Sequence, residues 1–262
     1  SAATGGCLFP GDCPAQSRGC RRCPGTGDAT GRHLPGRARL VRRLRAFAAG
    51  RRGITPTAPS AWMAGQARRA GLFRLPVRVI PNGVDVALFA PGDRAALRRE
   101  LGLPLDTPIV LVACGALGDA RKGSATAAAV LGRLPGPAPL VLAVGRDDAA
   151  SQALFAGLRC RFEGYVHDRA RLAALYAAAD VHLAATTGDN LPLTALETMA
   201  CATPTVAFAT GGTPEAVRHD TDGWLARPGD VDTLLQGLML ALTETAHREA
   251  WGGSARERAA TH

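Results

Sequence analysis

The sequence has no long hydrophobic run. Apolar stretches such as 108–114 and 140–144 fall far short of the ~20 residues that a membrane-spanning helix requires. Residues 1–10 also lack a basic start followed by an apolar run, which argues against a secretion signal. Segments rich in Val, Leu and Ile nevertheless recur from Val77 onward, so we expect a folded core rather than disorder. These features exclude a transmembrane class and leave a protein of one large or two small domains.

Lysine and aromatic residues are scarce. The 31 basic residues include a single lysine, Lys122, and the net charge is +9. An excess made almost wholly of arginine, in a chain rich in alanine and glycine, indicates compositional bias and weakens any inference from charge to a nucleic-acid partner. Aromatic residues make up 5% of the chain, which leaves few side chains for stacking on single-stranded bases. We therefore expect no nucleic-acid partner.

Basic residues are concentrated in segment 37–52, where RARLVRRLRAFAAGRR predicts an amphipathic helix. Leu40, Leu44 and Phe47 form its apolar stripe. Two interpretations stay open: a surface helix that covers the core, or a helix that contacts an anionic membrane surface. We expect a cytoplasmic protein, which under the second interpretation is peripheral at the inner face of the cytoplasmic membrane.

The seven cysteines fall into two groups. Three lie singly in apolar surroundings and are expected to be small core residues: Cys114, Cys160 and Cys201. The others crowd into a Gly- and Pro-rich stretch with the spacing C-x5-C-x6-C-x2-C: Cys7, Cys13, Cys20 and Cys23. Their last pair has the CxxC spacing of a zinc knuckle, and a chain without a secretion signal disfavours disulfides. The cluster predicts a structural zinc site, with a disulfide or redox pair, or free thiols, as the alternatives.

From Val77 onward the chain alternates short apolar runs with helix-like segments, the pattern of strand–helix–strand units and a parallel sheet. Strands are predicted at 77–80, 109–114, 140–144, 160–163, 180–184, 204–208 and 223–226. Helices are predicted at 92–101, 124–134, 150–157, 168–178, 191–201, 213–219 and 230–244. We expect Ser124, Asp168 and Asp230 to cap three helices, and Thr213 with Pro214 to open a fourth. The fold class is therefore α/β, whose functional loops follow the carboxyl ends of the strands.

The loop Gly115–Gly123 leaves a buried strand and enters a helix at Ser124. Its glycines let the backbone approach an anion, the helix N-terminus presents free amides, and Lys122 adds a positive charge. It is not a Walker A loop, because the lysine precedes the glycine. These residues alone are consistent with a diphosphate site or with an ordinary strand-to-helix turn.

A second loop carries two carboxylates, Asp189 and Glu197. Asp189 and Asn190 are predicted to lie at a helix N-terminus, which places Glu197 about two helical turns further on. Helical spacing predicts an apolar stripe of Leu193, Leu196 and Ala200, beside a face with Asn190, Thr194, Glu197 and Cys201. Glu197 either lies on a solvated stripe or, with Asp189, faces a cleft where carboxylates accept hydrogen bonds from the hydroxyls of a sugar and a ribose.

A resemblance to a known family is carried by residues 189–217, DNLPLTALETMACATPTVAFATGGTPEAV. This segment is similar to the donor-binding core of the retaining glycosyltransferases of family 4, also called group 1. The lead-in at 162–186, FEGYVHDRARLAALYAAADVHLAAT, and the turn at 79–89, VIPNGVDVALF, match the same family. Upstream, 54–73 resembles the end of its N-terminal domain. Residues 4–24 resemble a cysteine-rich insert of a subset that acts in exopolysaccharide and colanic-acid-type synthesis.

The resemblance implies a GT-B fold, in which two Rossmann-like domains share the site and the C-terminal one holds most of a nucleotide-sugar donor, without a catalytic metal. Residues 1–85 are then the remainder of an N-terminal, acceptor-side domain, and 86–245 form a complete donor domain. Residues 246–262 start a helix that returns to the N-terminal domain. Because fewer than ninety residues precede the expected joint at Pro81–Asp85, the resemblance implies a partial N-terminal domain and a chain that is poorly active alone.

The resemblance also assigns roles by position. Lys122 contacts the donor diphosphate, Glu197 accepts the ribose hydroxyls, and Asp189 lies beside the donor sugar as the catalytic acidic residue. The backbone amides of Asn190 and Leu191 meet the sugar or phosphate. The base is flanked by Gly164, Tyr165 and Val166.

The chain departs from the family at three positions. Asp189 stands where the family has Glu, Ala202 stands where it usually has Gly, and Ala116 stands where many members carry a second phosphate-binding arginine. Arg121 is expected to substitute for that arginine, or else the charge is missing and the phosphate clamp is weaker.

The function implied is transfer of a sugar, with retention, from a nucleoside-diphosphate sugar to a saccharide or lipid-linked saccharide in bacterial polysaccharide synthesis. Two alternatives remain. The first is a non-catalytic nucleotide-sugar-binding remnant, and the second is a zinc-stabilised nucleic-acid-binding module.

Overall fold

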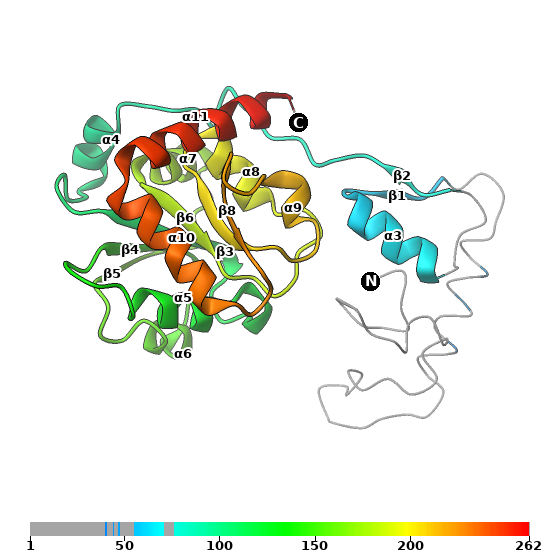
Figure 1. Cartoon of the computed structure of the whole chain (residues 1–262), viewed down its shortest axis with the longest axis horizontal. Coiled ribbons are helices and arrows are strands. Elements are labelled where there is room, and N and C mark those ends of the chain that lie inside the picture. The colour runs from blue at the N-terminus through cyan, green and yellow to red at the C-terminus, as the bar shows by residue number, and fades with distance from the viewer. Residues whose placement is uncertain (1–39, 41–43, 45–46, 48–54, 71–75, 262) are drawn as a thin grey trace. The chain divides into compact units, whose positions relative to one another are not determined.

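The computed structural model describes residues 40, 44, 47, 55–70 and 76–261 (Figure 1). Within the predicted basic helix, Leu40, Leu44 and Phe47 are helical, as the pattern predicts, and all three side chains are exposed. The four cysteines of the N-terminal cluster lie outside the described residues, so their zinc site stays a prediction. No helix in the described part of the chain is long and apolar enough to cross a membrane.

The chain divides between Pro81 and Asn82 into two compact units. The described part of the first contains β1 (Thr57–Ala58), α3 (Ala61–Ala70) and β2 (Arg78–Val79), with β1 and β2 paired in parallel. β2 confirms the strand predicted at 77–80. The sequence prediction missed α3, although Ser60 marks its start: the Ser60 hydroxyl accepts a hydrogen bond from the backbone N–H of Met63 at 3.1 Å.

The second unit is built on a six-stranded parallel sheet with the order β5-β4-β3-β6-β7-β8. Its strands are β3 (Ile109–Ala116), β4 (Leu140–Arg146), β5 (Cys160–Gly164), β6 (Val181–Ala184), β7 (Thr205–Phe208) and β8 (Gly223–Ala226). All six strands were predicted from the sequence. Because β3 and β6 are neighbours at the middle of the sheet, the loops that follow them meet at one edge.

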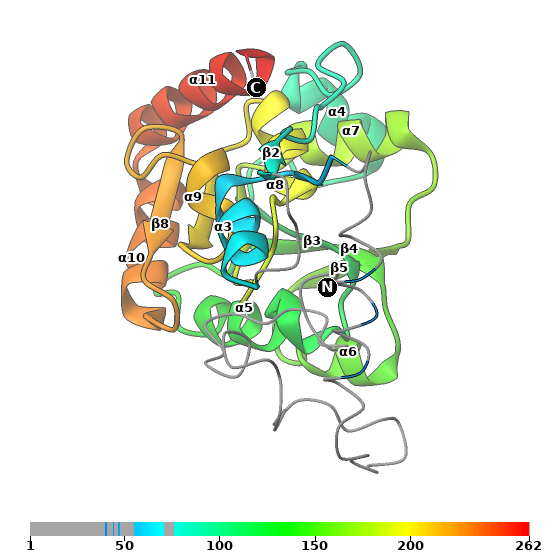
Figure 2. The same cartoon turned by 90° about the vertical axis from the view of Figure 1, so that its right-hand side faces the viewer.

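Helices cover both faces of this sheet (Figure 1). They are α4 (Arg94–Leu101), α5 (Ser124–Leu131), α6 (Ala149–Ala153), α7 (Arg169–Ala178), α8 (Leu193–Ala200), α9 (Thr213–Ala216), α10 (Val231–Thr243) and α11 (Thr245–Thr261). Figure 2 shows α4, α7 and α11 on one side of the central strands and α5 and α6 on the other. This layered arrangement confirms the predicted α/β class.

Alternate residues of the strands feed two separate cores, because successive side chains of a strand point to opposite faces. On β3, Ile109 and Leu111 pack among residues of α7, α8 and α11. Val110 and Val112 pack on the other face, against residues of α5 and α10. The central strands β3 and β4 are therefore buried on both faces over most of their length, which is why they begin as continuous apolar runs in the sequence.

The predicted helix starts are mostly confirmed. Asp168 accepts hydrogen bonds from the backbone of α7, Asp230 accepts one from Thr233, and Pro214 lies in the first turn of α9. The cap predicted at Ser124 is wrong, because α5 begins at this residue and its N-cap is Gly123, without a side-chain cap. A left-handed backbone at Gly123, with φ of 75°, makes the entry to α5 instead.

Three predicted helices end earlier than expected. α5 stops at Leu131, where Arg133 N–H bonds to Val130 O in a tighter turn. α6 ends at Ala153, and the chain after it runs to Gly157 in turns whose N–H groups bond to the carbonyl three residues earlier. α9 stops at Ala216, because Val217 takes an extended backbone. Apolar periodicity cannot separate such turns from an α-helix, since both keep the same side chains on the core.

His182 on β6 is 1% exposed, and its Nδ1 lies 3.2 Å from the Thr205 hydroxyl and 3.3 Å from the Thr198 hydroxyl. Burial lowers its pKa from 6.5 to about 4. The unfolded chain therefore takes up a proton at a higher pH than the folded chain. Stability that is present above pH 6.5 is thus lost progressively as the pH falls toward about 4.

We predict that this loss reaches about 3 kcal/mol of unfolding free energy. Urea unfolding from pH 7.5 to 4 measures it, with His182→Gln as the matched control, because glutamine does not titrate. Subtracting the two profiles removes the contribution of the carboxylates. Parallel profiles for the two proteins would contradict the prediction.

Candidate functional site

Lys122 and Asp189 meet at the carboxyl edge of the sheet. The Lys122 Nζ lies 2.6 Å from Asp189 Oδ2, and both side chains are partly buried. Lys122 ends a short 3-10 turn, Ala120–Lys122, that follows β3, while Asp189 lies in the loop between β6 and α8. The structure thus brings together the two loops that the sequence singled out, and it places a cation and an anion at their junction.

Backbone hydrogen bonds join the same two loops. The Arg121 carbonyl accepts from the Thr187 N–H and from the Thr186 hydroxyl, each at 2.9 Å. The Thr210 hydroxyl, which follows β7, donates to the Thr186 carbonyl at 3.0 Å. Sequence reasoning missed these threonines, although two adjacent hydroxyl residues before Gly188 are a turn signal. These hydrogen bonds hold the turn that carries Lys122 against the loop that carries Asp189.

Two glycines allow the loops to approach this closely. A Cβ on Gly123 would lie 1.9 Å from the Ala185 carbonyl oxygen, and one on Gly211 would lie 1.8 Å from the Asp189 carbonyl oxygen. Both have positive φ, 75° and 59°, a conformation that L side chains rarely adopt. Any other residue at either position would push the loops apart.

The backbone holds Asp189 from two sides. The Asn190 N–H donates to Asp189 Oδ1 at 2.9 Å, and the Gly212 N–H donates to the Asp189 carbonyl at 3.0 Å. Asn190 is exposed, whereas Leu191 is buried. The carboxylate therefore has one oxygen on a backbone amide and the other on Lys122.

Glu197 lies half-buried in the middle of α8. Burial raises the pKa of its carboxyl, and the positive charge of Arg169 partly opposes that rise. The apolar stripe expected on this helix is wrong at Leu193, which is 47% exposed. α8 begins two residues later than predicted, and Ala195, Leu196 and Met199 form its buried side instead.

Gly164 ends β5, and Tyr165 and Val166 follow it, two strands away from β3 along the same edge. Tyr165 is 51% exposed. The Arg146 guanidinium, at the end of β4, lies 5.6 Å from its ring centroid, and the His167 ring contacts it edge-on at 4.7 Å. Arg146 was not among the predicted site residues. The group presents a flat, partly exposed aromatic surface backed by a cation.

Arg121 is engaged by a neighbour. Its guanidinium pairs with Asp119 in a two-point contact, with Nη2 at 2.7 Å from Oδ2 and Nε at 3.2 Å from Oδ1. This carboxylate, two residues before it, neutralises the charge that the sequence assigned to phosphate. The backbone carbonyl of Arg121, rather than its side chain, joins the two loops.

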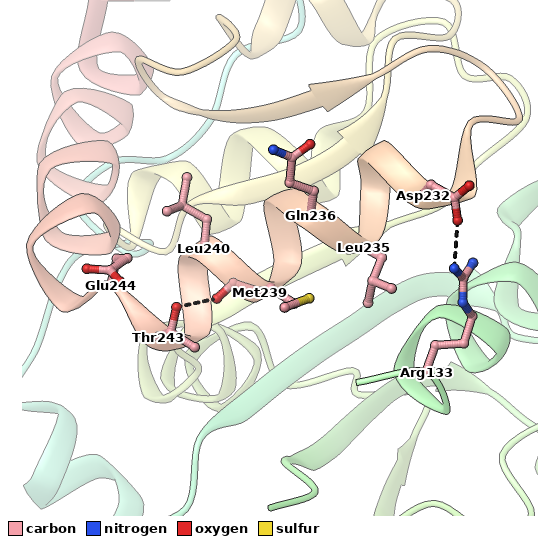
Figure 3. A pocket seen from close by; sticks show the side chains of 8 residues that line it. All are labelled: Arg133, Asp232, Leu235, Gln236, Met239, Leu240, Thr243 and Glu244. Carbon is pink, nitrogen blue, oxygen red and sulfur yellow. Dashed lines mark hydrogen bonds and ion pairs between the residues drawn. The ribbon is translucent and has the colours of Figure 1, made fainter. Parts of the chain in front are cut away.

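A hollow of about 380 Å³ lies elsewhere, along α10 (Figure 3). Seven of its lining residues are on or next to that helix, and Arg133 closes one end through an ion pair with Asp232 at 2.6 Å. None of the predicted site residues lines it. Within the described residues, no group of three or more His, Cys, Asp or Glu side chains is placed to hold a metal ion.

A parallel α/β sheet with glycine-containing loops and helix N-termini at its carboxyl edge defines a Rossmann-like domain of the nucleotide-binding kind. Residues 108–244 match the family described as glycosyl transferases group 1. The chain belongs to this family.

Curated relatives of the chain are named as glycosyltransferases. The D-inositol 3-phosphate glycosyltransferase of Xylanimonas cellulosilytica is 34% identical over 194 residues, which cover 69% of this chain and 46% of that protein. The enzyme of the same name from Mycolicibacterium paratuberculosis is 36% identical over 177 residues, covering 63% of this chain and 40% of that protein. The chain thus spans less than half the length of these curated relatives.

Solved structures show the same fold. Sucrose-phosphate synthase from Thermosynechococcus elongatus superposes with a TM-score of 0.74 at 29% identity, over 85% of this chain and 57% of that one. HepE from Anabaena, in complex with UDP and glucose, superposes with a TM-score of 0.73 at 24% identity, over 85% and 62%. These likenesses show the α/β, GT-B-type fold.

Replacing Gly123 by alanine tests the close approach of the two loops. We predict that Gly123→Ala lowers the free energy of unfolding by at least about 2 kcal/mol, because the Ala185 carbonyl must move in addition to the backbone strain. The matched control is Gly136→Ala, where φ is 82° and no atom lies within 4 Å of the added Cβ. Urea denaturation compares them, and equal losses in both variants would contradict the prediction.

Proposed function

We propose that residues 82–262 bind the nucleoside-diphosphate part of a sugar donor, and that the protein to which they belong is a retaining glycosyltransferase of family 4. The observation that carries the proposal is the Lys122–Asp189 pair, 2.6 Å long, between the 3-10 turn after β3 and the start of α8. Family membership supports the reaction class. The geometry supports the division of labour among the residues.

Lys122 is suited to hold the diphosphate. An ammonium carries three donors, and Asp189 occupies one of them, which leaves two for phosphate oxygens. The N-terminal amides of α8 add donors and a favourable dipole for an anion. Lys122 at the same time balances the Asp189 carboxylate, which would otherwise repel the diphosphate.

The sugar and the ribose would lie against carboxylates. Asp189 follows the loop at the α8 N-terminus, and Glu197 lies further along the same helix. Ionised carboxylates only accept hydrogen bonds, so hydroxyl groups are their natural ligands. We assign Asp189 to the donor sugar and Glu197 to the ribose, with the backbone of Asn190 and Leu191 beside the phosphates.

The base would lie at the end of β5. Gly164, Tyr165 and Val166 present backbone groups and an exposed ring there, and Arg146 backs the ring. The HepE structures contain UDP and UDP-glucose, which supports a uridine nucleotide as the first donor to test.

In the proposed reaction the bond between the anomeric carbon and the diphosphate oxygen breaks, and the acceptor hydroxyl oxygen bonds to that carbon. The hydroxyl proton passes to the departing diphosphate. Lys122 and the helix amides stabilise the charge on the leaving group, which is electrostatic catalysis without covalent participation of the protein. No catalytic metal enters the proposed step, because Lys122 supplies the positive charge.

The acceptor proposed is a saccharide or lipid-linked saccharide of bacterial polysaccharide synthesis, at the inner face of the cytoplasmic membrane. The relatives offer a competing class of acceptor, because these proteins are named D-inositol 3-phosphate glycosyltransferase. A chain that binds donor without transferring the sugar to either acceptor class would favour the alternative of a non-catalytic binding remnant.

Removing the lysine tests the diphosphate assignment. We predict that Lys122→Met raises the Kd for UDP about tenfold or more, because a charge-assisted contact contributes about 1.5 to 3 kcal/mol. Calorimetry measures it, with Arg133→Met as the control, since Arg133 is also ion-paired but lines the hollow along α10. Equal affinity in Lys122→Met and the parent protein would remove Lys122 from the site.

The raised pKa of Glu197 predicts a pH dependence of nucleotide binding. Burial favours its protonated form, whereas ribose hydroxyls bind best to the carboxylate. UDP affinity should therefore fall as the pH drops through the raised pKa of Glu197. In Glu197→Gln, affinity should be lower at neutral pH and should lose this part of the pH dependence. The ratio of the two Kd values across pH 4 to 8 cancels the titration of the nucleotide, and a constant ratio would sink the assignment.

A further inference from the structure

One arginine of α11 ties two distant segments together. Arg256 Nη1 donates to the Ala200 carbonyl at 2.8 Å and to the Phe89 carbonyl at 2.9 Å. Its Nη2 donates to the Val86 carbonyl at 3.0 Å. Ala200 is the last residue of α8, so the guanidinium also places a positive charge where the helix dipole is negative. Figure 1 shows the chain that leads to α4 running beside α11.

The other segment, 82–89, opens the second unit and reaches both ends of α8. At its start, the Asn82 Nδ2 donates to the Leu191 carbonyl, just before α8, in a long hydrogen bond of 3.4 Å. At its end, Phe89 is fully buried and stacks on Tyr176 of α7 with ring centroids 5.9 Å apart. Segment 82–89 is therefore anchored in the core, contacts the loop just before α8 directly, and contacts the C-terminal end of α8 through Arg256.

The same anchor reaches the proposed ribose-binding residue. The Arg169 guanidinium lies 5.4 Å from the centroid of the Phe89 ring. Its charge acts on Glu197, which is on α8. Phe89, whose carbonyl is held by Arg256, thus also contacts through its ring the cation whose charge acts on Glu197.

We propose that Arg256 is a positioning residue for the donor site: by fastening segment 82–89 to the C-terminal end of α8, it sets where Glu197 and loop 189–192 lie. This inference rests on the proposed function only for the identity of the ligand. α8 has eight residues, so its own hydrogen bonds fix its internal geometry but not its place in the unit. Binding groups have to be held within about 0.5 Å of the productive position, and three carbonyl contacts to one planar guanidinium provide that restraint.

The experiment combines hydrogen exchange with nucleotide binding in the full chain. In Arg256→Met we expect the backbone amides of α8 to exchange about tenfold faster, while those of α5 and α10 keep their rates. The Kd for UDP should rise about fivefold or more. Arg256→Lys should fall between the two, because an ammonium keeps the charge but cannot serve three carbonyls in one planar fork.

The matched control is Arg248→Met, on the same helix. Arg248 donates to the Ala241 carbonyl at 3.1 Å and lies 3.9 Å from Asp180. Neither of these two contacts involves α8 or segment 82–89. A general loss of stability would affect both variants alike. We expect Arg248→Met to keep the α8 exchange rates and the Kd of the parent protein.

The outcomes separate the two proposals. Unchanged α8 exchange in Arg256→Met, or equal weakening of UDP binding by Arg248→Met, would overturn the positioning role. If the parent chain binds none of UDP, GDP and ADP, the proposed function fails, and the exchange measurement alone decides whether Arg256 fixes α8. If Arg256→Met does not fold, Arg256→Lys replaces it in both measurements.

Discussion

The ion pair between Lys122 and Asp189 is the contact around which the carboxyl edge of the sheet is built. Both side chains are about one quarter exposed, at 29% and 24%, and pairs with this much solvent contribute little to stability. The ion pair instead serves to position a charge, because it holds the only lysine of the sequence at the junction of two loops. The hydroxyls of Thr186 and Thr210, and the missing Cβ atoms of Gly123 and Gly211, all serve that junction.

Support for the junction comes from residues far away in the sequence. α11 lies across α8 and contributes Arg256. Arg258 of α11 also pairs with the buried Asp222, as Arg218 does, and this pairing fixes α11 to the turn before β8. The loops proposed to bind the donor therefore rest on elements that are tied together by side-chain contacts. This arrangement fits the proposed site, which acts by positioning and charge, because a misplacement of about 1 Å can cost roughly a hundredfold in rate.

Much of the second unit could be predicted from the sequence, because most of its strands are short, largely apolar runs that are buried. The loops with Lys122 and Asp189, and Glu197 on the following helix, could also be singled out, since glycine, capping and charge signals lie at strand ends. The contacts themselves could not be predicted. The bond from Thr187 to the Arg121 carbonyl, the pairing of Arg121 with Asp119, and the reach of Arg256 to Val86 depend on tertiary packing. Leu193 shows the same limit, because a two-residue shift of the helix start exposed it.

The measurement that tests the account most directly is an amide chemical-shift map of the full chain titrated with UDP. The account predicts that the shifts concentrate in 118–124, 164–166 and 186–192 and spare the residues that line the hollow along α10, Leu235 to Glu244. Shifts that instead concentrate along α10, with loops 118–124 and 186–192 unchanged, would contradict the assignment of the donor site to the carboxyl edge of the sheet.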